Sequence, residues 1–317
     1  MNNRLVILSD LHLGRPDGVT DVAQLDALIE EGGRIVLNGD TAEQHDARYR
    51  ARAVDSLGSL YALARSRGTT LTLLAGNHDP ELTNDRGLLV SGGTVLITHG
   101  DAFHPAVAPW SVRASAMRVA WAKTISSFPI ERRDSLEARF AATRSAGIAE
   151  RDAPGGYTKP AHLVVRPCAA AIIVAYWWRF PALAARFADR FAPSATTIIT
   201  GHTHRPCVRT YRGRTIVNTG SFAPPHAPFA VVMSDLKLQF FPVVARTTFG
   251  RRTFLLGERP RASMALQAPF DAPCGAGNPA LKSLEGNGRP SASPIPFPAA
   301  NSATRSTRVA SPDLSHA

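Results

Sequence analysis

Short apolar runs that end in glycine and reactive side chains recur along the chain. Residues 71–75 are apolar or β-branched and are followed at once by Gly76, Asn77, His78 and Asp79. Runs of the same design lie within residues 5–8, 34–38, 95–98 and 197–200. A short apolar run bounded by turn residues is typical of a buried strand. Because an α/β sheet presents reactive groups beyond the carboxyl ends of its strands, the pattern predicts that these runs meet at one site.

The segments between the first three predicted strands carry apolar side chains at helical spacing. Residues 21–31 carry apolar side chains at helical spacing and are followed by Gly32 and Gly33. Residues 46–67 form a longer segment of the same kind, which ends at Gly68. Strands that alternate with helices at this spacing predict an α/β fold.

Between residues 104 and 190 the pattern changes to helices without a strand signal. Helices are expected within residues 110–125 and 130–148, and Gly155-Gly156 interrupts the run. Because this segment is inserted between two strands that carry reactive residues, it must emerge near the site. We therefore expect residues 104–190 to form a helical cap or lid.

The most apolar stretch of the chain lies inside this insertion, at residues 168–178. Arg166 and Arg179 bracket it, which leaves far fewer than the roughly 20 residues needed to cross a bilayer. Two interpretations follow: a helix buried against the core, or an interfacial helix that contacts acyl chains through its Tyr-Trp-Trp edge.

Hairpins follow the last of the glycine-marked strands. Residues 207–211 and 215–218 flank Arg212-Gly213, and residues 229–233 and 237–243 flank a second turn. Beyond residue 259 Pro, Ser, Ala, Gly and Asn dominate without apolar periodicity. We therefore expect a folded domain over residues 1–258 and a disordered tail over 259–317.

Composition limits the class of protein. The chain has 317 residues, of which 44% are apolar, and three scattered cysteines without a CxxC pair. Such a chain is globular, and it shows neither a disulfide framework nor a thiolate zinc site. The first residues lead into a strand without an apolar signal region, so we expect a cytoplasmic protein.

The net positive charge of the chain indicates an anionic partner. The formal net charge is +11, and residues 104–191 hold 13 Lys and Arg against six Asp and Glu. Candidates are a phosphorylated substrate, an anionic lipid surface and nucleic acid. Because the cations concentrate in the insertion, we expect the cap to make peripheral contact with the inner face of a membrane.

The strand ends supply nitrogen and oxygen ligands of the kind that bind metals. A single histidine at a strand end is usually a structural residue, but here the motifs D-x-H, G-D, G-N-H-D, H-G-D and G-H-x-H occur together. The candidate ligands are Asp10, His12, Asp40, Asn77, His99, His202 and His204. This set is too large for one ion and suits two, bridged by a carboxylate. Without a thiolate, Mn is favoured, with Fe or Zn as alternatives.

Two such ions, about 3.5 to 4 Å apart, can hold a hydroxide and stabilise its in-line attack on phosphorus. His78 lies between a ligand and Asp79, so we expect Asp79 to orient the ring. The imidazole would then protonate a leaving alkoxide or bind phosphoryl charge. Arg205 and His104 lie beside ligands and are candidate substrate contacts.

Other polar residues near the motifs receive weaker assignments. Asp101 is expected to orient His99, and Thr203 the imidazoles on either side of it. Four histidines have no motif context and are expected to be surface or structural residues: His45, His162, His226 and His316.

The five motifs resemble those of the calcineurin-like metallophosphoesterase family over roughly residues 4–245, and residues 218–221 resemble its N-x-G-S turn. The resemblance implies a four-layer α/β/β/α sandwich of two mixed sheets with a helical cap insertion. It also implies that one metal is held by Asp10, His12, Asp40 and His204, and the other by Asp40, Asn77, His99 and His202. His78 matches the family's histidine that is not a ligand.

The basic helical insertion resembles the acyl-chain cap of UDP-2,3-diacylglucosamine hydrolases. That subgroup has arginine at the position of His78 and a different block after Asp40. The resemblance implies a phosphoester or pyrophosphate hydrolase that acts on a lipid-linked nucleotide. The alternatives are a phosphodiesterase or phosphomonoesterase for a soluble substrate, a nuclease, and a non-catalytic binding protein on the same fold.

Overall fold

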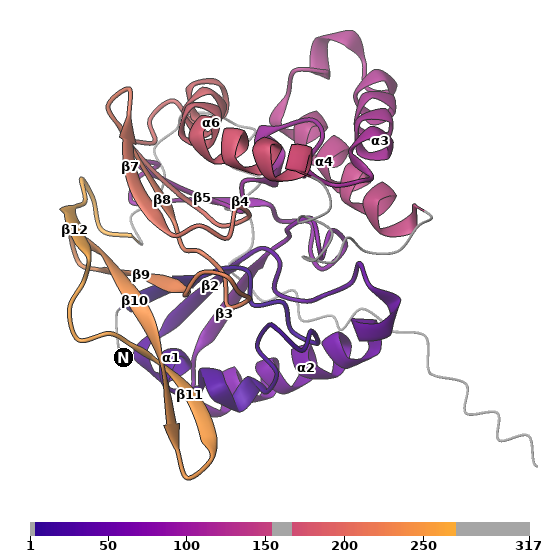
Figure 1. The fold of residues 1–317 in the computed structure, drawn as a ribbon. Coiled ribbons are helices and arrows are strands. Elements are labelled where there is room, and N and C mark those ends of the chain that lie inside the picture. Colours follow the sequence, from indigo (N-terminus) through magenta and orange to yellow (C-terminus); the bar gives the residue numbers. More distant parts are fainter. Residues whose placement is uncertain (1–3, 154–166, 271–317) are drawn as a thin grey trace, which may run out of the picture. The chain divides into compact units, whose positions relative to one another are not determined.

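The computed structural model describes residues 4–153 and 167–270, which fold around two mixed sheets (Figure 1). The first sheet has the strand order β11-β10-β9-β1-β2-β3, with β12 paired to β10. Its strands are β1 (Arg4–Leu8), β2 (Arg34–Asn38), β3 (Thr70–Leu74), β9 (Phe229–Ser234), β10 (Lys237–Thr248), β11 (Arg251–Leu256) and β12 (Ala262–Ala265). Strands β1, β2 and β3 run parallel, so their carboxyl ends lie at one edge.

The second sheet has the strand order β4-β5-β6-β8-β7. Its strands are β4 (Gly87–Val90), β5 (Val95–Thr98), β6 (Thr197–Thr200), β7 (Cys207–Tyr211) and β8 (Arg214–Asn218). Strands β5, β6 and β8 run parallel, and each ends in one of the polar motifs. Both hairpins expected from the sequence are present, as β7–β8 and β9–β10.

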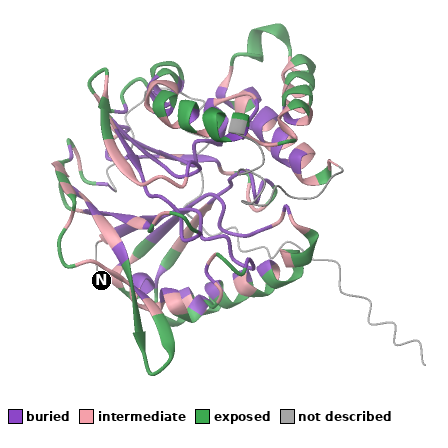
Figure 2. Cartoon of the chain, in the orientation of Figure 1, coloured by how far each residue is buried: buried purple, intermediate pink, exposed green. Residues whose placement is uncertain are grey.

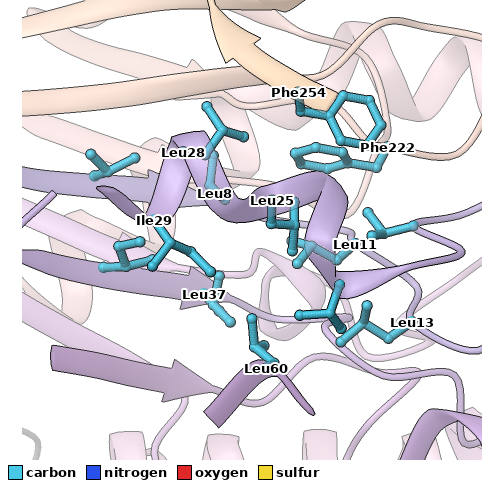
Figure 3. Packing of buried hydrophobic residues seen from close by; sticks show 14 of the residues in the cluster. Leu8, Leu11, Leu13, Leu25, Leu28, Ile29, Leu37, Leu60, Phe222 and Phe254 are labelled. Carbon is cyan, nitrogen blue, oxygen red and sulfur yellow. The ribbon is translucent and has the colours of Figure 1, made fainter. Parts of the chain in front are cut away.

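Helices cover the outer face of each sheet. The helical elements are η1 (Val22–Leu25), α1 (Asp26–Glu31), α2 (Ala47–Ser66), η2 (Asp101–Phe103), α3 (Ala114–Ser127), η3 (Ile130–Arg132), α4 (Leu136–Asp152) and α6 (Pro167–Phe191). Asp46 caps α2 by accepting from the amide of Arg48. Figure 3 shows α1 and its neighbours packed through Leu25, Leu28 and Ile29 against the apolar side chains of the first sheet.

Three apolar clusters define the layers. One joins η1, α1 and α2 to the first sheet, a second lies between the sheets, and a third joins the second sheet to α6 and α4. The cluster between the sheets includes Ile7 and Val36 from the first sheet and Ile97 and Ile199 from the second. Figure 2 shows these strands as the buried interior. The fold is therefore an α/β sandwich with the layer order α/β/β/α.

The described part of the 104–190 insertion is helical, but α6 belongs to the sandwich as much as to a cap. Its buried stripe, Tyr176, Phe180, Ala184, Phe187 and Phe191, packs against the second sheet. The expected length of the apolar segment was wrong, because the helix continues through Arg179 to Phe191. Within the described residues, Cys168–Phe191 has the length and composition of a membrane span, with a mean hydropathy of 1.4 and 28% of the window buried.

The connection after His78 contains the strand β4, which pairs with β5. One boundary differs from the sequence prediction. The folded domain continues past residue 258, because β12 pairs with β10 and Phe270 is buried between the sheets. Composition missed this segment because a few apolar side chains, spaced along a polar stretch, are enough to anchor it. The predicted disorder of residues 271–317 lies outside the described residues.

The anchoring role of Phe270 can be measured by truncating its side chain. Phe270 is 3% exposed whereas Phe249 is fully exposed. We expect Phe270→Ala to lower the free energy of unfolding by about 3 kcal/mol, through lost burial and a residual cavity. Phe249→Ala should change it by less than about 0.5 kcal/mol. Urea unfolding followed by circular dichroism compares the two, and equal effects would mean that the segment after β12 does not anchor the fold.

Candidate metal centre

The polar motifs meet where the parallel strands of both sheets end. Strands β1, β2 and β3 lead to Asp10, Asp40 and Asn77, and β5 and β6 lead to His99 and His202. A buried amide joins the two sheets directly behind the site. Asn38 Nδ2, from β2, donates to the carbonyl oxygens of Thr98 at 3.2 Å and Ile199 at 3.4 Å. The two sheets thus bring their strand ends to one place.

Most of the predicted ligands sit on left-handed backbone. Positive φ angles occur at Asp10 (54°), His12 (48°), Asp40 (51°), His202 (67°) and His204 (56°). For residues other than glycine this region costs roughly 1–2 kcal/mol each, and such residues cluster at functional sites. The loops therefore turn sharply after each strand and direct alternate side chains inward. Glycine is required close by, because a Cβ at Gly76 would overlap the Asp40 carboxylate.

Asp10, His12, Asp40 and His204 form the first group of candidate ligands. Their donor atoms all lie within 4.8 Å of one another. His204 Nε2 lies 3.2 Å from His12 Nε2 and 3.1 Å from Asp10 Oδ1. Two donors bound to one ion at about 2.0–2.2 Å are separated by roughly 3 Å. The spacing within this group therefore fits coordination of a single ion.

Asp40, Asn77, His99 and His202 form the second group. The carbonyl of Asn38 accepts from His99 Nδ1 at 2.9 Å, which directs Nε2 to within 3.3 Å of Asp40 Oδ2. The carbonyl of Val107 can only accept, so His202 Nε2, 3.1 Å away, carries the proton. Nδ1 of that ring then carries a lone pair and lies 3.0 Å from Asn77 Oδ1. An imidazole nitrogen and an amide oxygen at this spacing fit coordination of one cation by both side chains.

Charge in the site also favours a cation. Asp10 and Asp40 are buried carboxylates, and a buried charge is costly unless it is compensated. Although burial alone would lower it, these carboxylates raise the pKa of His99 to about 10. Burial lowers the pKa of His202 to about 4, helped by the charge on His99. The donor set and its excess negative charge thus fit divalent metal ions.

Asp79 does not orient His78, contrary to the sequence prediction. Its carboxylate accepts from the backbone amides of Asp40 (3.1 Å), Thr41 (2.7 Å), Ala42 (3.1 Å) and Gly76 (2.7 Å). Burial, together with the nearby Asp40, raises the pKa of Asp79 to about 6. The side chain therefore joins the loop after β2 to the loop after β3. Sequence adjacency misled here, because the neighbouring side chains point in different directions.

Glu43 holds His78 instead. Its oxygens lie 3.0 and 3.1 Å from His78 Nδ1, and one lies 3.7 Å from His12 Nδ1. The carboxylate is 1% exposed, and the neighbouring imidazoles keep its pKa well below the ordinary value despite burial. Sequence analysis missed Glu43. Its place three residues after Asp40, in a loop that returns to the site, was the available signal.

His45 was expected to be a surface or structural residue, and it is buried beside the site. Its ring centroid lies 4.4 Å from that of His78, with 30° between the ring planes. A carboxylate from the insertion, Glu150, lies 3.9 Å from His45 Nδ1. Neither residue carried a motif signal, because only the tertiary fold brings them together.

The two candidate substrate contacts lie at the edge of the site. The guanidinium of Arg205 stacks over the ring of Trp177 at 5.2 Å. His104 Nδ1 accepts from the amide of Ala106, and burial with nearby arginines lowers the pKa of His104. Both side chains are partly exposed, so their assignment to substrate stays a prediction.

Asp101 and Thr203 were expected to orient the ligand imidazoles, and their side-chain hydrogen bonds go to other residues. Asp101 forms a buried ion pair with Arg86 at 2.7 Å, and a backbone carbonyl orients His99. Thr203 Oγ1 accepts from Asn218 Nδ2 at 3.0 Å. This bond ties the loop that carries His202 and His204 to the end of β8.

Comparisons with known proteins return distant likenesses. No family model matches the sequence, and no curated protein matches it. Vps29 of Chaetomium thermophilum aligns with a TM-score of 0.41 at 12% identity, over 84% of this chain and 98% of that one. A dimetal phosphatase from Danio rerio aligns at 0.40 and 12%, over 80% and 98%. A predicted phosphoesterase from Streptococcus pneumoniae aligns at 0.33 and 12%, over the same shares. The chemistry of this site therefore rests on its own geometry.

Metal stoichiometry tests the two groups of ligands. We expect His204→Ala and His99→Ala each to weaken one of two Mn²⁺ sites at least about 100-fold. Asp40→Asn should weaken both sites, because this carboxylate contacts both groups. Calorimetric titration of EDTA-treated protein measures each site, with Asp55→Asn on the exposed face of α2 as the control. Loss of the same single site in all three ligand variants would refute the two-ion arrangement.

Proposed function

We propose that the chain is a metal-dependent phosphoric ester hydrolase that cleaves a phosphoester or pyrophosphate bond. The observation that carries the proposal is the convergence of Asp10, His12, Asp40 and His204, with donor atoms within 4.8 Å. Beside them, the 3.0 Å spacing of His202 Nδ1 and Asn77 Oδ1 is compatible with a second ion. A pair of divalent ions, with Mn as the first candidate, supplies Lewis acidity that neutralises phosphoryl charge and acidifies water.

His78 is the proton donor in this proposal. The Glu43 carboxylate lies 3.0 Å from His78 Nδ1 and accepts its hydrogen bond. We assign the opposite nitrogen, Nε2, to the leaving group. As the bond from phosphorus to the leaving oxygen breaks, the Nε2 proton passes to that oxygen, and solvent water later returns a proton to the ring. His12 also contacts the His78 ring, with centroids 4.9 Å apart.

The insertion shapes the space in front of the metal ligands. The ring of Trp110 lies 5.5 Å from that of His202, and Tyr176 lies 6.2 Å from the same imidazole. The indole of Trp177 donates to the carbonyl of Thr203 at 3.1 Å. Aromatic side chains of the insertion therefore border the ligand loops. This apolar border supports a substrate with an apolar part, such as a lipid-linked nucleotide diphosphate.

Substrates with different leaving groups distinguish a general acid from a structural histidine. We expect His78→Gln to reduce kcat about 10² to 10⁴-fold on a substrate with an alkyl leaving group. The loss should be much smaller on bis-p-nitrophenyl phosphate, whose leaving group departs without protonation. Steady-state kinetics with Mn-loaded protein measures both, and metal content is checked in the same samples. Equal losses on the two substrates would remove the general-acid assignment.

The class of substrate needs a parallel assay. Mn-loaded protein would be tested on bis-p-nitrophenyl phosphate, p-nitrophenyl phosphate, UDP-diacylglucosamine and single-stranded DNA. The lipid-linked proposal expects cleavage of UDP-diacylglucosamine in detergent micelles at the highest kcat/KM. Preference for a soluble ester would favour the general phosphoesterase, and preference for DNA would favour a nuclease. Inactivity on every substrate with two metals bound would favour a binding protein on the same fold.

We also propose that the outer face of the insertion contacts an anionic membrane surface. Ile172, Val174 and Trp178 on α6 are 42%, 46% and 76% exposed. Arg179 and Arg186 on the same helix are also exposed. An exposed aromatic and aliphatic face bordered by arginine suits the boundary between lipid head groups and acyl chains.

Vesicle flotation tests this membrane contact. We expect the protein to float with vesicles of phosphatidylcholine and phosphatidylglycerol and not with phosphatidylcholine alone. Trp178→Ser should reduce the bound fraction several-fold, because the indole is the largest exposed apolar side chain on α6. Tyr61→Ser is the control, since Tyr61 is 51% exposed on α2. Equal binding of both variants would place the membrane contact elsewhere or exclude it.

A further inference from the structure

A buried polar pair joins the insertion to the core beside the candidate site. Glu150, near the end of α4, is 7% exposed, and His45, before α2, is 6% exposed. Glu150 Oε2 lies 3.9 Å from His45 Nδ1. Within residues 4–153 and 167–270, neither ring nitrogen of His45 nor this carboxylate oxygen has a well-formed hydrogen bond. Each buried polar atom without a partner costs about 1–3 kcal/mol, so its retention calls for an explanation.

Helix α4 reaches this position by packing directly on the loop that carries Asn77 and His78. A Cβ at Gly147 would lie 3.1 Å from the Asn77 carbonyl oxygen and 3.1 Å from the Pro80 ring. The glycine therefore allows the helix to approach the loop backbone closely. At the end of the helix, the Arg113 guanidinium donates to the Glu150 carbonyl at 2.5 Å. These contacts fix where the Glu150 side chain enters the core.

The pair continues to the proposed proton donor. The His45 ring contacts the His78 ring in a tilted arrangement, with centroids 4.4 Å apart. The His45 amide also donates to Glu43 at 2.9 Å, and the same carboxylate holds His78 Nδ1. His78 is thus held at one nitrogen by Glu43 and along one face by His45. Among the described residues of the insertion, Glu150 contacts this arrangement through His45.

Packing alone does not account for these residue types. Apolar residues of similar volume would fill the same space without the desolvation cost of a buried carboxyl and imidazole. A carboxylate that contacts an imidazole can instead fix the orientation of the ring. Here the ring that it would fix lies 4.4 Å from the His78 ring, with 30° between the ring planes. Through His45, a residue of the insertion can therefore affect the orientation in which the His78 ring faces a substrate.

We propose that Glu150, acting through His45, is a positioning residue that holds the His78 ring in its productive orientation. The helical insertion is then part of the catalytic apparatus, in addition to any contact it makes with substrate or membrane. The kinetic consequence of this proposal rests on the proposed function, in which His78 protonates the leaving group. The structural consequence, an altered His78 environment, does not depend on catalysis.

The structural consequence can be read by NMR of protein with isotope-labelled histidine. The His78 signals are assigned by their loss in His78→Gln. We expect Glu150→Leu and His45→Phe to shift the His78 ring resonances, and Glu150→Gln, which keeps the shape and one acceptor, to shift them less. Glu137→Gln, on the exposed surface of the same helix, should leave them unchanged. Circular dichroism confirms that each variant is folded, and Glu150→Gln decides the question if Glu150→Leu does not fold.

A double-mutant cycle tests whether Glu150 affects kcat through His78. We expect Glu150→Leu to lower kcat about 10-fold on an alkyl leaving group, with KM and metal content unchanged. In a His78→Gln background the same change should have no further effect, because coupled residues are not additive. Unshifted His78 resonances, or an equal loss of kcat in both backgrounds, would overturn the proposal. Shifted resonances in a protein without hydrolase activity would retain the positioning contact and remove only the proposed function.

Discussion

The site depends on one carboxylate that joins two loops. Asp79 accepts four backbone amides, three from the loop after β2 and one from the loop after β3. Those amides would otherwise be buried without partners in strained turns, at a cost of about 1–3 kcal/mol each. The bonds set the distance between Asp40 and Asn77, and the His78 amide adds a bond to Asp40 at 2.8 Å. The residue that resembles a catalytic partner in the sequence is thus the one that builds the frame.

The ligands could be predicted from the sequence because their signal is local. A parallel strand delivers the next few residues to its carboxyl end whatever the rest of the chain does. Asp10, Asp40 and His99 follow their strands immediately, so the pattern of strands already placed them together. The packing of the two sheets depends on contacts between residues far apart in the sequence, and only the family resemblance implied it. It depends on apolar faces such as Ile7 against Ile97, which no short window reveals.

The partners of His78 could not be predicted for the same physical reason. Glu43 and His45 reach the ring through a returning loop, and Glu150 contacts His45 from a helix far along the chain. Composition failed at the edges of elements as well. Helix α6 was cut short at Arg179, because an exposed arginine is compatible with a helix whose opposite face is buried. Likewise, Phe270 is a single buried aromatic side chain in an otherwise polar stretch, so composition did not reveal that this segment is anchored.

The strain and the buried charge of the site support the proposed catalysis. A scaffold that only binds a partner gains stability when strained loops relax and buried charges are replaced by apolar side chains. This chain keeps five left-handed positions among its candidate ligands, together with the buried carboxylates of Asp10 and Asp40. It also keeps the unpartnered His45 and Glu150 atoms in the described core. Backbone strain and buried polar groups of this kind are typical of functional sites.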